Sequence, residues 1–135
     1  MFRTAVRYFL MAGISLLAAV VQAEDEVPVA TQYIHLEPAI VVNYGSTGRM
    51  KYLRTEVALK VTGAEAAARV SHHKPYIRNN LVLLFSAQEA DTMNSAKGRE
   101  SLRKVALDEV RALMIKLEGM PYVDDLYFSN FVVQN

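Results

Sequence analysis

The alternation of apolar and polar positions marks a pair of strands in the first half of the chain. Residues 33–44 and 49–61 are rich in β-branched and aromatic side chains, and the turn-forming sequence GSTG at 45–48 joins them. In residues 49–61, apolar side chains alternate with polar ones, which predicts one face on a core and one facing water or a partner. We expect an antiparallel hairpin. Pro38 should lie at an edge or a bulge, because proline supplies no amide to a ladder.

Helical periodicity follows the hairpin. An alanine-rich run begins near Ala64, and Pro75 should cause a kink or a restart because it cannot continue a helix interior. Apolar residues then recur three and four positions apart as far as Phe85. Ser86 and Glu89 have the spacing of a capping box and predict another short turn, although Ser86 could equally end the preceding helix.

The clearest helix lies further along. Residues 92–97 are polar and predict a loop, and a long amphipathic helix is expected from beyond Gly98 to about Glu118. Gly119 and Pro121 follow in the order typical of a helix end.

The last element and the order of all the elements define the fold class. Residues 123–134 predict a third strand, with a change of phase near Ser129 and Asn130 that indicates a bulge. We therefore predict an α+β fold, in which an antiparallel sheet of about three strands packs against helices in the order β-β-α-α-β.

The N-terminal segment has the features of a secretory signal peptide. A basic start precedes the uncharged residues 8–21, and Ala23 supplies a small residue ahead of an acidic stretch. As a helix, residues 8–21 would reach about 21 Å, against the roughly 30 Å of a bilayer core, so cleavage is favoured over a short membrane anchor. We expect a leader over residues 1–23, a linker over 24–30 and one domain over 31–135.

Composition argues against several kinds of chemistry. A net charge of +1 with 21% charged residues provides no extended basic surface for nucleic acid. Zero cysteines exclude disulfides, thiolate nucleophiles and cysteine-based zinc sites. His72 and His73 are adjacent and point in different directions on a helix, and no serine lies in a nucleophile-elbow pattern. We predict no catalytic residue, no metal site and no cofactor, and therefore binding instead of catalysis.

Several segments, taken in order, resemble the flagellar basal body-associated protein FliL family over residues 33–134. The shared segments are YIHLEP at 33–38, VVN at 41–43, YLR at 52–54, VAL at 57–59, KPYIRN at 74–79, GRESLR at 98–103 and VDDLYFSNFVVQ at 123–134. The resemblance implies a periplasmic domain similar to the stomatin-type (SPFH) fold. Typical members keep an uncleaved transmembrane helix, and the shorter leader of this chain departs from that pattern.

The resemblance also implies a function and partners. It suggests a non-enzymatic protein that forms a homo-oligomeric ring around the stator units of the flagellar motor and supports rotation and motility. Its partners would be further copies, the stator and basal body proteins, and its place would be the periplasm, associated with the inner membrane directly or through those partners.

Mixed-sign side chains are the candidate contact residues between subunits. They are Arg54, Glu56, Lys60, Arg99, Glu100 and Arg103. An ordinary solvated surface would look the same in sequence. Arg103 lies in the helix-opening motif, so Arg103→Glu is expected to reduce motility or ring formation while leaving the fold intact.

A different class of function is a soluble periplasmic carrier that binds a small apolar ligand between sheet and helices. Aromatic residues could line such a pocket, although they more commonly fill a core. The candidates are Tyr33, Tyr44, Tyr52, Tyr76, Phe85, Tyr127, Phe128 and Phe131.

Overall fold

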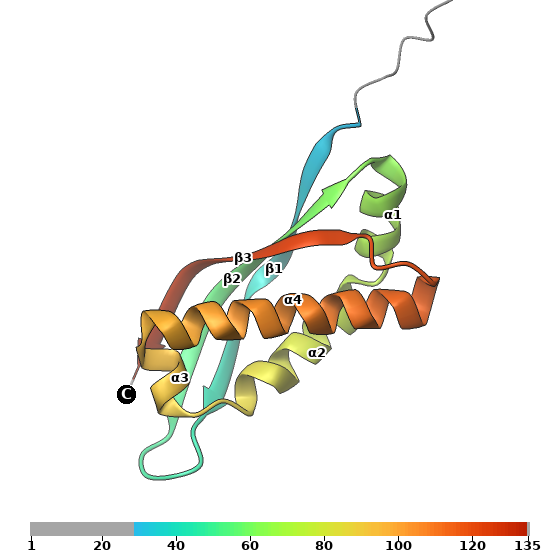
Figure 1. Ribbon diagram of the computed structural model, residues 1–135. Helices are drawn as coiled ribbons and strands as arrows, with labels where there is room; N and C mark the ends of the chain where they lie inside the picture. Colours follow the sequence, from blue (N-terminus) through green and yellow to red (C-terminus); the bar gives the residue numbers. More distant parts are fainter. Residues whose placement is uncertain (1–28, 135) are drawn as a thin grey trace, which may run out of the picture.

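A computed structural model describes residues 29–134, which form a three-stranded antiparallel sheet with helices on one face (Figure 1). The elements are β1 (Thr31–Tyr44), β2 (Lys51–Thr62), α1 (Ala64–His72), α2 (Lys74–Ser86), α3 (Ala90–Asn94), α4 (Ala96–Glu118) and β3 (Val123–Gln134). The strand order is β1-β2-β3, so β2 is central. The predicted α+β class is confirmed, with a three-stranded antiparallel sheet and two strands before the helices and one after them. The expected leader and most of the expected linker lie outside the described residues.

The hairpin forms as its sequence predicts. Gly45 and Gly48 in the connecting turn have φ angles of 92° and 81°, a region that favours glycine. Pairing between β1 and β2 shifts register between Leu36 and Ile40. Pro38 therefore lies in a bulge, where its missing amide leaves no gap in the ladder.

The helical segments show one confirmed restart and one wrong prediction. Pro75 lies in the first turn of α2, directly after α1 ends, which confirms the restart. Residues 92–97 do not form a loop, because α3 and α4 occupy most of them. Fully buried Met93 anchors α3, and the side chain of Ser95 accepts the Gly98 N–H at 2.9 Å, which starts α4 early. The Ser86 hydroxyl donates to the Val82 carbonyl at 2.6 Å and so belongs to the end of α2.

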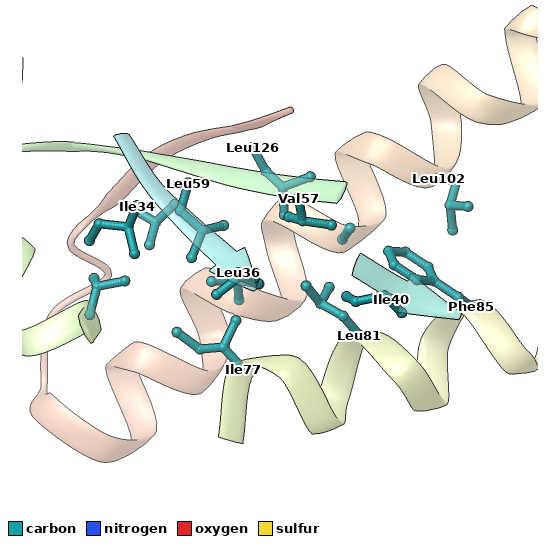
Figure 2. Packing of buried hydrophobic residues seen from close by; sticks show 14 of the residues in the cluster. Ile34, Leu36, Ile40, Val57, Leu59, Ile77, Leu81, Phe85, Leu102 and Leu126 are labelled. Carbon is teal, nitrogen blue, oxygen red and sulfur yellow. The ribbon is translucent and has the colours of Figure 1, made fainter. Parts of the chain in front are cut away.

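The hydrophobic core fills the space between the sheet and the helices, as Figure 2 shows for its central members. Inward residues of all three strands meet the apolar stripes of α2 and α4, with Leu59, Leu81 and Leu126 fully buried. The rings of Phe85 and Phe128 pack edge to face with centroids 5.6 Å apart. All the described helices that contribute to this core lie on one side, so the other sheet face is left uncovered by the described residues (Figure 1).

Arginines from the helices hold the two outer strands. Arg78 of α2 donates to the carbonyl oxygens of Pro38 and Ala39 in β1, the second at 3.0 Å. Arg103 of α4 donates to the carbonyl of Leu126 in β3 at 3.0 Å, and Arg111 donates to that of Val123. These bonds tie α2 to the β1 edge and α4 to the β3 edge, and they occupy acceptors that an edge strand otherwise exposes.

Candidate interaction surfaces

The uncovered sheet face carries half of the predicted contact residues. Arg54, Glu56 and Lys60 lie on β2, whose apolar residues at the alternate positions point into the core. Exposed apolar side chains from all three strands share this face. They are Tyr33, Val41, Tyr52, Tyr127 and Val132, with exposed fractions between 38% and 60%. An apolar face that also carries charges of both signs is suited to contact with another protein.

Irregular pairing hollows this face in the middle. The register shift in β1 lies close to a second shift, between β2 and β3, next to Asn130 with its φ of 50°. The second shift confirms the predicted bulge. Glu56 accepts a hydrogen bond from the Asn130 amide at 2.8 Å. His35, Glu37, Glu56 and Ser129 line the resulting hollow.

Arg103 joins α4 to β3 through a cluster of charged groups. Its guanidinium donates to Asp125 Oδ1 at 2.7 Å and to both carboxylate oxygens of Glu100, at 2.7 and 2.9 Å. The Tyr127 hydroxyl donates to the other oxygen of Asp125 at 3.0 Å. Arg103 is therefore a link within the fold, and these contacts revise the expectation that Arg103→Glu leaves the fold intact.

The same bonds set the proton affinities in this cluster. Burial raises the pKa of Asp125, but hydrogen bonds from the Leu126 amide, the Tyr127 hydroxyl and Arg103 outweigh it, so the pKa lies below its usual value. The hydrogen bond from Arg103 lowers the pKa of Glu100. Donation to Asp125 raises the pKa of Tyr127. At neutral pH these shifts favour charged carboxylates on Glu100 and Asp125 and a protonated Tyr127 hydroxyl, the forms that make the hydrogen bonds described above.

The remaining predicted residues meet at the start of α4. The Arg99 guanidinium lies 5.7 Å from the centre of the Phe131 ring. Arg99, Glu100 and Arg103 line a hollow beside β3 together with Phe131. The structure thus divides the six candidates between two surfaces, the open sheet face and the α4–β3 hollow.

The sequence missed Asp125 and Tyr127 as members of the Arg103 cluster. The spacing of three between Glu100 and Arg103 is a sequence signal for their ion pair. No signal identifies Asp125, which is 22 residues away from Arg103 along the chain.

One of the two adjacent histidines makes a structural contact. The His73 ring lies 2.7 Å from Glu118, and Arg69 donates to the same carboxylate at 3.2 Å. The hydrogen bond with His73 is the main cause that lowers the pKa of Glu118, with the charge of Arg69 adding to it. This contact joins the α1–α2 junction to the end of α4. Within residues 29–134, no group of three or more metal-binding side chains converges.

The aromatic residues proposed for a carrier pocket are divided between core and surface. Phe85 and Tyr44 are buried in the core, whereas Tyr33, Tyr52 and Tyr76 are exposed. Burial raises the pKa of Tyr44. The proposed set therefore does not line one enclosed cavity between sheet and helices.

Fold and surfaces together define a small α+β domain with features for protein contact. Residues 33–134 match the model of the family described as flagellar basal body-associated protein FliL, and the chain belongs to that family. Among the described helices, none has both the length and the apolar character needed to cross a membrane.

Two relatives illustrate the match. Flagellar protein FliL of Aquifex aeolicus is 26% identical over 99 residues, which cover 73% of this chain and 59% of the relative. Flagellar protein FliL of Escherichia coli K12 is 24% identical over 93 residues, 69% of this chain and 59% of the relative. The matched region thus spans about three fifths of each relative's length.

Proposed function

We propose that this protein is a non-enzymatic accessory protein of the flagellar motor. It acts in the periplasm, associated with the inner membrane at the basal body, where it self-assembles around stator units and supports them during rotation. Membership of the family described as basal body-associated, over nearly the whole described domain, is the observation that carries this proposal.

The shape of the domain supports a role in assembly. One sheet face packs on helices, and the other presents tyrosines and valines around Arg54, Glu56 and Lys60. Apolar area supplies affinity and mixed charge supplies specificity, so this face is suited to recognising a protein surface.

Localisation tests the proposal directly. A short epitope inserted between Thr47 and Gly48 lies in the exposed β1–β2 turn, away from the core. In flagellated cells, the tagged protein should form foci at flagellar bases, and these foci should weaken when the stator proteins are deleted. A diffuse signal that is the same with and without the stator would overturn the proposal.

Charge reversal tests the role of the open face. Arg54→Glu should reduce swimming speed, because it places a negative charge on the central strand of this face, between Val41 and Val132. Lys116→Glu is the matched control, since it makes the same reversal at an exposed position on α4, at the end of the helix away from Arg99, Glu100 and Arg103. Normal swimming of cells whose Arg54→Glu protein is folded would show that the open face does not contact the motor.

A further inference from the structure

We infer that copies of this protein join by sheet extension, with the β1 edge of one copy paired in parallel to the β3 edge of the next. The inference rests on the proposed self-assembly and specifies its contact. Both strands lie at the edges of the sheet, because β2 pairs on its two sides with β1 and β3 (Figure 1). Unpaired edges are templates for another strand.

The second half of β3 lacks the usual protection of an edge. Residues 126–134 contain no charge and no proline, the two features that most often block edge pairing. Arg103 and Arg111 occupy carbonyl groups only in the first half of β3, at Leu126 and Val123. After the bulge at Asn130, regular pairing with β2 resumes at Val132. This leaves the end of β3 as a free edge.

The free part of β1 lies at the same end of the sheet. Arg78 covers the carbonyls at residues 38 and 39, and the Gly45 N–H donates to the Gln88 carbonyl at 3.1 Å. Residues 40–44, between these points, are again uncharged. The described residues place no further strand against either edge.

The two free edges match in residue type, and their matching residues pair with the same residues of β2. Val41 and Val132 both pair with Arg54, one on each side, and they are 60% and 47% exposed. Two residues further along these strands, Asn43 of β1 and Gln134 of β3 both pair with Tyr52. If neighbouring copies join without a shift along the strands, Val41 of one copy lies beside Val132 of the next, and the side-chain amides of Asn43 and Gln134 lie beside each other. β-branched side chains pack well between neighbouring strands, and stacked side-chain amides form hydrogen-bonded ladders.

Strand direction favours this contact over pairing of two identical edges. Since β1 and β3 are both antiparallel to β2, they run parallel to each other. Adding β1 to β3 therefore repeats every copy in the same orientation, with all β1 strands starting on one side. That is the arrangement needed by proteins held at one membrane. A β3–β3 pair related by an axis perpendicular to the sheet would turn one copy upside down.

The contact is short, which decides how it must be tested. Four or five residues on each edge form a much smaller interface than the roughly 800 Å² per partner of a stable complex. We expect such contacts to hold only where copies are concentrated at the basal body and bind together. The test therefore uses the full chain in flagellated cells.

Cysteine cross-linking reports the contact, because the chain has no cysteine of its own. A chain carrying both Val41→Cys and Val132→Cys should form a ladder of disulfide-linked oligomers under mild oxidation. Within one copy the two positions are two strand spacings apart, roughly 9.5 Å, too far for a disulfide. The matched control pairs Val132→Cys with Val105→Cys, an exposed valine on α4. It should give no ladder, and neither should the single Val132→Cys variant.

An amine-reactive cross-linker applied to the natural chain distinguishes the possible failures. Amine-linked oligomers without a cysteine ladder would overturn the strand-edge contact and leave self-assembly standing. A dimer from Val132→Cys alone would show that two β3 edges meet, and would also overturn the inference. Absence of oligomers in both experiments would refute self-assembly itself, and the edge contact with it.

An edge lysine provides an independent readout. Val132→Lys should abolish the amine-linked oligomers, because a charge on the edge strand opposes pairing. Val105→Lys adds the same amine at a similarly exposed valine, 45% against 47%, and should leave the oligomers unchanged. Equal oligomer yields from the two variants would contradict the inference.

Discussion

Gly98 is a position at which even one added methyl group should destabilise the fold. A Cβ atom placed there would lie 2.3 Å from the Thr92 carbonyl oxygen and 2.7 Å from both the Thr92 Cα and the Ser95 Oγ. Two of these three atoms belong to the backbone of α3, which Met93 holds in the core. The glycine is thus required for the close approach between the α3 backbone and the first turn of α4.

Two opposing terms decide the effect of Gly98→Ala. Alanine in place of glycine in a helix stabilises by up to about 1 kcal/mol. Forcing an extra methyl group into a closely packed site costs about 1–3 kcal/mol, and relief here requires movement of the backbone instead of a flexible side chain. We expect net destabilisation of about 1–2 kcal/mol, which for a domain of this size lowers Tm by about 5–10 °C.

Thermal unfolding of the purified protein, followed by circular dichroism, measures this effect. Lys104→Ala, an exposed substitution on the same helix, is the control and should change stability by less than about 0.5 kcal/mol. If Gly98→Ala has an unchanged or higher Tm, helix propensity outweighs the close approach and the packing argument is refuted.

Three further predictions concern the clusters and the core. Arg103→Glu should lower Tm more than Arg103→Lys, because it adds a carboxylate beside two others; equal Tm values would deny the link. Because the pKa of Glu118 lies below its usual 4.5, its charge stabilises the fold above that pH, and the stabilisation is lost as pH falls through the lowered value. Glu118→Gln should therefore flatten the fall in Tm below about pH 4.5, and an unchanged slope would argue against the His73 contact. Leu81→Ala should cost about 2–5 kcal/mol in urea unfolding, since Leu81 is fully buried; a cost under 1 kcal/mol would contradict the core packing.

Local patterns in the sequence were sufficient for most of the fold. Alternation along β2 predicts which side chains face the core, Pro75 marks where one helix ends and another begins, and Gly119 ends α4 with a φ of 81°. Each signal acts within a few residues, where steric and hydrogen-bonding preferences are strong. The error at residues 92–97 arose because a buried methionine outweighed polar neighbours, which is a tertiary effect.

The candidate surfaces were less predictable. Sequence patterning placed Arg54, Glu56 and Lys60 on one face, because alternation fixes the direction of side chains in a strand. The sequence pattern could not show that Arg103 donates hydrogen bonds to Asp125 and to the Leu126 carbonyl, because these contacts depend on how α4 crosses β3. The face on which a side chain lies is set by its own strand, whereas a contact between two elements depends on how they pack in the fold.

The location of the last strand affects the choice of fusion proteins. Gln134 pairs with Tyr52 in the ladder, so β3 belongs to the sheet up to its last residue. A fluorescent protein joined directly after Gln134 would therefore lie beside this strand. Loss of swimming in such a strain would reflect obstruction by the reporter, and a long flexible linker or an insertion elsewhere should restore it.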